Sequence, residues 1–292
     1  MYLQQLNRWI VRQAFGQASY PVSRFTRWEF HGALVNLNQA TLNRVTAYDP
    51  VTGQPFAGYD SISTSASRSY AFPGIALVHD NTVFGWTSTL LGQRYRFDVS
   101  QAVGGLSFTQ VIADYRRYDM LAFPFTFATR LTMEGRFGRD DDLFPMYLGM
   151  PDEVRGYTYT SLLDRECSSA QASQTGTCPE LNQLIGSRIA VASAEFRFPL
   201  LRQAVLGFLP VGFPPIEGAV FFDMGIAWQR GSTFAWNPSA SDPNVRAPIR
   251  SWGASARVNL LGFAILSIDY AIPLDRPQHK RGYWIVSLYQ PF

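Results

Sequence analysis

Apolar and polar residues alternate with a period of two along most of this chain, which is the pattern of a β-strand with two different faces. The clearest run is 123–136. One face carries Phe125, Phe127, Leu131 and Met133, and the other carries Thr126, Ala128, Arg130, Thr132, Glu134 and Arg136. A soluble sandwich buries its apolar face and turns its charged face to water. Here charged residues stand at mid-strand between aromatic-rich ends, which is typical of a strand between a wet lumen and lipid.

The same alternation predicts about eleven antiparallel strands, each near the length that a tilted membrane strand needs. An all-β transmembrane barrel is therefore the expected fold. Residues 1–23 are left open between the remnant of a strand whose partner lies upstream, which we favour, and a loose amphipathic helix. The predicted strands are 24–36, 41–48, 71–79, 93–103, 106–118, 123–136, 187–200, 216–229, 253–260, 263–272 and 281–292.

The predicted connections alternate in length, as they do in barrels with short periplasmic turns and long outer loops. Tight turns are expected at 37–40, 119–122 and Gly262, and the longest connection is 138–186. Two connections on the periplasmic side, 81–92 and 201–215, are not short, and the Gly104–Gly105 turn on the outer side is tight. The alternation still ends the last strand in the periplasm.

The composition agrees with a membrane barrel. Hydrophobic residues make up 47% of the chain and charged residues only 16%, against about 25% charged in soluble domains. The mean hydropathy is nevertheless −0.06, and no run approaches the roughly 18 apolar residues of a spanning helix. The net charge of +3 is small and scattered, so nucleic acid is not an expected partner.

The sequence shows few signs of catalytic or ligand chemistry. It has no G-x-S-x-G elbow, no P-loop and no dinucleotide fingerprint. His31, His79 and His279 are isolated, and the acidic run 140–142 is better explained as a solvated loop than as a metal site. We therefore expect no enzyme activity, no cofactor and no metal.

Three motifs follow one another in the second half of the chain. They are Val154-Arg155-Gly156-Tyr157, then 195–200 (EFRFPL), then 221–225 (FFDMG). Together they resemble the bacterial surface antigen superfamily of outer-membrane barrels, which includes the barrel-assembly insertase and the two-partner-secretion translocases. The resemblance covers about 24–292, and it is specific because the motifs occur in the family's order on predicted strands.

The resemblance implies a location in the outer membrane and a long extracellular loop that folds into the lumen. It also implies that this chain holds the C-terminal 11–12 or so strands of a 16-stranded family barrel. Residues 24–292 would form the barrel domain, without the first strands and any periplasmic domains. Because no secretory signal follows Met1, we expect either a mature form or, by preference, the C-terminal part of a longer protein.

Strand alternation aims two carboxylates of these motifs, those of Glu195 and Asp223, into the lumen. The resemblance brings the arginine of the loop to these strands, and the planar guanidinium of Arg155 suits carboxylates. The alternative is a solvated Arg155 in an outer loop. The expected lumen contacts are Val154, Arg155, Gly156, Tyr157, Glu195, Arg197, Phe221, Asp223 and Gly225.

Two further features lie in the outer loop and at the C-terminus. Cys167 and Cys178 are the only cysteines and flank a polar stretch, so a disulfide in an oxidising compartment is expected, worth about 3 kcal/mol; two free thiols are the alternative. Trp284, Val286, Leu288 and Phe292 share one face of the last strand. They resemble the C-terminal signal for barrel assembly, although an ordinary closing strand would look similar.

The functions compatible with this pattern fall into three classes. The first is protein insertion into, or translocation across, the outer membrane, with nascent outer-membrane or secreted proteins as clients. The second is a membrane anchor or conduit for a fused N-terminal domain, such as a patatin-like lipase or a β-propeller, and the third is a passive diffusion channel. Outer-membrane lipids, lipopolysaccharide and upstream periplasmic domains or partners are the other expected contacts.

Overall fold

One antiparallel sheet dominates the computed structural model, which describes residues 2–49, 52, 54–64, 67–149, 153–157, 179–201, 204–205, 212–237, 244–260, 262–276 and 282–289. Its main path joins eleven strands in chain order. These strands are β1 (Tyr2–Pro21), β2 (Thr26–Tyr48), β4 (Arg68–Asp80), β6 (Thr89–Gly104), β7 (Phe108–Ala122), β8 (Phe125–Gly138), β11 (Arg188–Leu201), β14 (Ile216–Trp228), β17 (Ile249–Leu260), β18 (Ala264–Pro273) and β19 (Tyr283–Tyr289).

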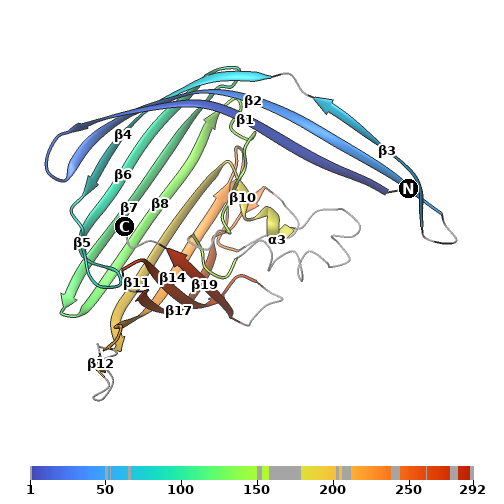
Figure 1. The fold of residues 1–292 in the computed structure, drawn as a ribbon. Coiled ribbons are helices and arrows are strands. Elements are labelled where there is room, and N and C mark those ends of the chain that lie inside the picture. The colour runs from blue at the N-terminus through green and yellow to red at the C-terminus, as the bar shows by residue number, and fades with distance from the viewer. Residues whose placement is uncertain are drawn as a thin grey trace.

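Two further strands pair with strands of the main path. β3 (Pro55–Thr64) pairs with β2, and β5 (Val83–Phe84) pairs with β6. Figure 1 shows the sheet curving around the segment that connects β8 to β11. The remaining short elements are β9 (Met146–Tyr147), α3 (Pro179–Asn182), β10 (Ile185–Gly186), β12 (Ala204–Val205), β13 (Gly212–Phe213), β15 (Thr233–Phe234) and β16 (Val245–Arg246).

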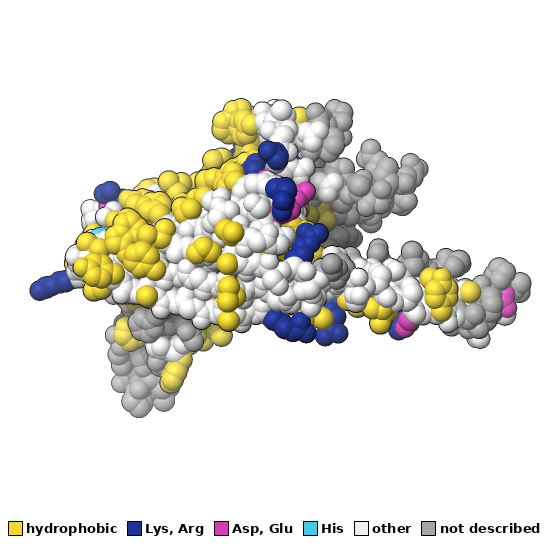
Figure 2. Space-filling view, turned by 90° about the horizontal axis from the view of Figure 1, so that it is seen from above, with side chains coloured by type: hydrophobic (Ala, Val, Ile, Leu, Met, Phe, Trp, Pro, Cys, Tyr) yellow, Lys and Arg dark blue, Asp and Glu magenta, His cyan; other side chains and the backbone are white. Residues whose placement is uncertain are grey.

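The two faces of the sheet differ as the alternation predicts, which confirms the barrel-type fold. On the outer face large apolar side chains are exposed, among them Phe127, Leu131, Phe222 and Ile268. On the concave face polar and charged side chains are buried, among them Glu29, Asp98, Glu195, Asp223 and Asp269. Seen from above, hydrophobic side chains gather over one part of the described surface, and charged side chains are few (Figure 2). The pattern is that of strands between lipid and a polar lumen.

The first two strands correct the prediction. The turn expected at 37–40 is wrong, because β2 runs unbroken through it and pairs with β1 from Arg27 to Thr46. Backbone pairing with β1 on one side, and with β4 and β3 on the other, holds this segment extended. Residues 2–21 form a strand rather than a helix, and the partner of that strand lies downstream.

The number of strands before and after the connection between β8 and β11 agrees with the prediction, although one of the predicted strands is replaced by another. Six strands of the main path precede it and five follow it. The segment 41–48, predicted as a separate strand, is the end of β2, and β1 takes its place in the count. Among the described residues β1 pairs only with β2 and β19 only with β18. The domain boundary at residue 24 stays a prediction. No helix in the described part is long and apolar enough to span a membrane.

Candidate functional site

The connection between β8 and β11, residues 139–187, is here called the lumen loop. Its described parts are 139–149, 153–157 and 179–187. Loop side chains form a common apolar cluster with inward side chains of the strands, and burial of this surface anchors the loop inside the sheet. The cluster comprises Met146, Leu148, Val154, Tyr157 and Leu184 from the loop, and Ile189, Val191, Ala227 and Ile249 from the strands.

Arg155 forms a two-pronged ion pair with Asp223 on β14. Its Nε donates to Oδ2 at 2.7 Å and its Nη2 donates to Oδ1 at 2.8 Å. The backbone N–H of Arg155 also points at Oδ2, at 3.3 Å. The Asp223 residue is 0% exposed, so water does not screen this pair as it screens a surface ion pair.

Glu195 on β11 is the centre of a wider charge cluster. Its Oε1 accepts from Arg155 Nη1 at 2.9 Å and from Arg257 Nη2 at 2.8 Å. Its Oε2 accepts from Arg197 Nε at 2.9 Å and from Arg257 Nη1 at 3.0 Å. Glu217 adds a third carboxylate, with Oε1 3.7 Å from Arg257 Nη1. Three guanidinium groups thus face three carboxylates, which offsets the cost of removing these charges from water.

The apolar residues of the motifs fit around this cluster. The Arg155 Cζ lies 3.3 Å from the centre of the Phe221 ring, which places a cation over an aromatic face. A Cβ at Gly225 would stand 2.6 Å from Val154 Cγ2, so the missing side chain makes room for the loop. A Cβ at Gly253 would stand 2.7 Å from the Phe221 ring. Glycine is therefore needed at 225 and 253 for packing.

Gly156 and Tyr157 carry the tip of the loop towards the outer ends of β17 and β18. Gly156 has a φ of +91°, a conformation that side-chain-bearing residues rarely adopt. The Tyr157 hydroxyl donates to the Arg250 carbonyl at 2.9 Å and accepts from the Asp275 N–H at 3.1 Å. Burial raises the pKa of this hydroxyl, because the phenolate would lose its hydration. It therefore stays a donor at neutral pH.

Several site residues were not anticipated from the sequence. Arg257 belongs to none of the three motifs, and nothing in the sequence links it to Glu195, which lies two strands away. Arg276 donates to the Gly156 carbonyl at 3.0 Å, and Arg250 pairs with Asp275 at 2.6 Å. These contacts lie in or beside extracellular connections, where no alternation along the chain indicates which way a side chain points. A family motif marks the arginine of the loop, whereas its secondary partners depend on the tertiary fold.

Two residues of the acidic run 140–142, Asp140 and Asp141, are paired with other groups of the protein. Asp141 accepts from Arg188 at 2.8 Å, and Asp140 accepts from the Ser107 N–H at 2.7 Å. The Arg139 side chain and this N–H hold the pKa of Asp140 below its ordinary value. Within the described residues no group of His, Cys, Asp and Glu has the geometry to hold a metal ion. The arrangement of charges fixes a loop in place.

Two predicted features cannot be followed fully in the structure. Cys167, Cys178 and Phe292 lie outside the described residues, so the disulfide and the terminal aromatic stay predictions. Trp284, Val286 and Leu288 are all exposed. They alternate on β19, opposite Tyr270, Ile268 and Leu266 of β18.

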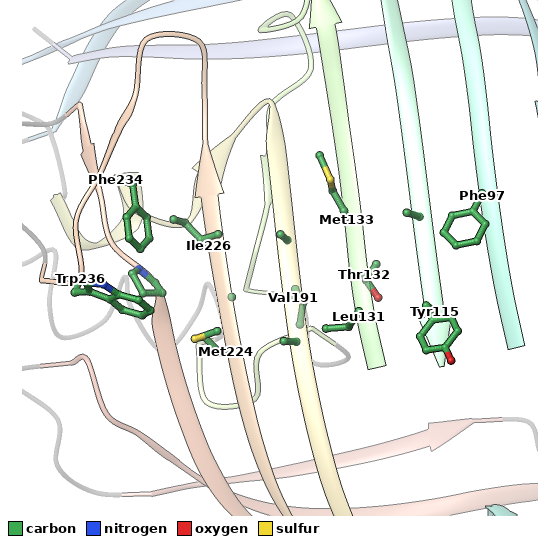
Figure 3. A pocket seen from close by; sticks show the side chains of 15 residues that line it. Phe97, Tyr115, Leu131, Thr132, Met133, Val191, Met224, Ile226, Phe234 and Trp236 are labelled. Carbon is green, nitrogen blue, oxygen red and sulfur yellow. The ribbon is translucent and has the colours of Figure 1, made fainter. Parts of the chain in front are cut away.

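The outer wall carries a shallow apolar groove of about 500 Å³. Small residues line its floor, among them Ala113, Ala190 and Ala192, and Phe234 and Trp236 lie at one end (Figure 3). The rings of these two aromatics are 5.3 Å apart. Because the groove lies on the same face as Leu131 and Met224, it belongs to the wall that meets lipid.

The fold and the lumen cluster define a class: a membrane β-barrel with an extracellular loop drawn into its interior. A family model described as the Omp85 superfamily domain matches residues 78–287. The chain belongs to this superfamily, and its place is the outer membrane of a Gram-negative bacterium. Barrels of this kind are not enzymes.

The comparison with solved structures agrees on the fold. The crystal structure of BamA from Haemophilus ducreyi lacking POTRA domains 1-3 matches with a TM-score of 0.54 and 12% identity. The match covers 98% of this chain and 62% of that chain, so this chain spans less than two thirds of the solved one. At this identity the likeness shows the fold alone. No sequence among the curated proteins matches the chain.

Proposed function

We propose that this barrel inserts proteins into the outer membrane or translocates them across it. The observation that carries the proposal is the pairing of Arg155 with Asp223 and Glu195. These contacts join the three motifs by which the chain resembles the insertases and translocases. Nascent outer-membrane or secreted proteins are the proposed clients, and periplasmic domains or partners would deliver them.

The filled lumen favours this function over passive diffusion. The lumen loop packs an apolar cluster against the strands, and Val154, Leu148 and Tyr157 are almost fully buried in it. A diffusion channel needs an open polar path. An insertase instead needs a sheet edge, because an exposed strand edge offers unpaired N–H and C=O groups to an incoming strand. The resemblance to the family implies that this edge lies at the seam between the first and last strands of the barrel.

The experiment is a folding assay in liposomes with the protein expressed from its own gene. A urea-unfolded small outer-membrane barrel is the client, and its folding is followed by its shift in gel mobility. We expect the protein to accelerate client folding over empty liposomes. Arg155→Lys should reduce the acceleration by about tenfold, equivalent to about 1.4 kcal/mol of barrier, because an ammonium lacks the planar fork.

The matched control is Arg44→Lys, since Arg44 pairs with Asp60 through the same two-pronged contact but in an exposed position. It should leave the acceleration unchanged. If the wild-type protein does not accelerate client folding at all, the proposal fails. A membrane anchor for a fused N-terminal domain would then be the better explanation.

A further inference from the structure

The connection between β4 and β6 forms a small hairpin that bends into the lumen. β5 pairs with the first residues of β6, with Val83 opposite Leu91, and Gly85 N–H donates to the Ser88 carbonyl at 2.8 Å. The bend lies at Gly92, which has a φ of +103°, and a Cβ there would stand 2.5 Å from the Asn81 carbonyl oxygen. Figure 1 shows the β5 end of the sheet turned towards the lower ends of β11 and β14.

The tip of this hairpin bonds strands on the far side of the lumen. The hydroxyls of Thr87 and Ser88 both donate to Glu217 Oε2 on β14, at 3.0 and 2.8 Å. On β17, Asn259 Nδ2 donates to the Trp86 carbonyl at 2.6 Å. Both hydroxyl-bearing residues are buried. A short turn would satisfy its polar groups with water, whereas these groups are satisfied by distant strands.

Two bonded paths lead from the hairpin to Arg155. In the first, Arg197 Nη1 donates to the Thr89 carbonyl at 3.1 Å while its Nε binds Glu195, which binds Arg155. In the second, Glu217 faces Arg257, which binds the same Glu195 carboxylate. The lumen loop enters from the extracellular side and the hairpin from the periplasmic side. Both end on one charge cluster.

We propose that the hairpin 83–91 is a periplasmic strap that braces the Arg155 cluster, so that its withdrawal from the lumen releases the lumen loop on the other side of the membrane. The hydroxyl groups of Thr87 and Ser88 hold Glu217, which faces Arg257, and the Thr89 carbonyl holds Arg197. Arg257 and Arg197 in turn bind Glu195 beside Arg155. Without the strap, Glu217 loses the hydroxyl donors of Thr87 and Ser88, and water reaches the part of the cluster that faces the periplasm. Coupling of this kind is reciprocal, so loosening the lumen loop also loosens the strap.

The test uses trypsin as a probe of the lumen loop in liposomes that contain the full chain. The Arg155–Gly156 bond is a trypsin site that is buried when the loop is in place. The double variant Thr87→Val/Ser88→Ala keeps the shape of the tip and removes both bonds to Glu217. Trypsin is added from the extracellular side, and its cleavage after Arg155 is mapped by mass spectrometry. We expect this cleavage to be at least about fivefold faster in the double variant, which is the lower end of typical coupling between two sites.

The matched control is Thr82→Val in the same connection, because the Thr82 hydroxyl bonds Asp80 locally at 2.6 Å rather than the far wall. It should leave the cleavage rate unchanged. The converse measurement is hydrogen exchange of the amides of 85–90, which should quicken in Arg155→Lys. An unchanged cleavage rate in the double variant, or equal acceleration by Thr82→Val, overturns the proposal. If the double variant does not fold, Ser88→Ala alone and the exchange measurement decide by the same criteria.

Discussion

Val154 packs against the bare backbone of Gly225, and a Cβ at Gly225 would lie 2.6 Å from Val154 Cγ2. One residue belongs to the loop motif and the other to the strand motif 221–225. Arg155 is next to Val154 in the loop, and Asp223 lies on the same strand face two residues from Gly225. The side chains of Arg155 and Asp223 form the ion pair. Packing and charge therefore fix the same register between loop and strand.

Gly225→Ala tests the packing half of this arrangement. The added methyl group has a β-branched neighbour that cannot move aside, so we expect a loss of about 1–3 kcal/mol, as in other overpacked cores. Urea unfolding in lipid vesicles measures this loss. Gly16→Ala is the control, since no atom lies within 4 Å of a Cβ at that position. A cost at Gly225 no greater than at Gly16 would contradict the packing.

Tyr157→Phe tests the tip of the lumen loop. The change removes a donor to the Arg250 carbonyl and leaves the Asp275 N–H without its acceptor. An orphaned buried polar group costs about 1–3 kcal/mol, so trypsin cleavage after Arg155 should quicken while the strands remain folded. Tyr59→Phe serves as control because Tyr59 is exposed on β3. Identical cleavage rates in the two variants would show that the hydroxyl does not hold the tip.

Leu131→Arg tests which face meets lipid. Leu131 is exposed on the outer face of β8, and a charge near the bilayer midplane costs about 2–4 kcal/mol. Leu274→Arg should cost much less, because Leu274 follows β18 in an extracellular connection. Unfolding in vesicles gives both values. Equal costs would mean that the face carrying Leu131 is not embedded in lipid.

The two cysteines give a prediction that needs no substitution. We expect Cys167 and Cys178 to form a disulfide on the outside of the cell, and closing so short a segment would contribute about 3 kcal/mol. Mass mapping of peptides from intact outer membranes, with and without reduction, detects the bond. Two free thiols in the unreduced sample would rule it out.

The sequence anticipated those parts of the fold that follow from a period of two. Alternation placed Asp223 and Glu195 inward and Leu131 outward, because a strand turns successive side chains to opposite faces. The predicted turn at 37–40 is wrong, because neighbouring strands pair along this segment and keep it extended. For the hairpin 83–91, the sequence pattern indicates only a periplasmic connection that is longer than usual.

The partners of Glu195 show why the site was only partly predictable. Arg197 stands two residues away on the same strand face, so alternation brings it close. Arg257 reaches the same carboxylate from β17, with β14 between the two strands. That proximity depends on sheet curvature and register, which one sequence does not encode in any local pattern.

The most direct test of the account is a double-mutant cycle between Arg155 and Asp223, with Arg155→Met and Asp223→Leu, measured by urea unfolding in lipid vesicles. Arg155→Met leaves the buried Asp223 without its partner and should cost about 3–5 kcal/mol, whereas Asp223→Leu leaves Arg155 paired with Glu195 and should cost less. The double variant should cost far less than the sum, since an apolar pair replaces the ion pair. Additive costs, with no coupling between the two positions, would mean that Arg155 does not reach Asp223 and that the loop is not held in the lumen by this pair.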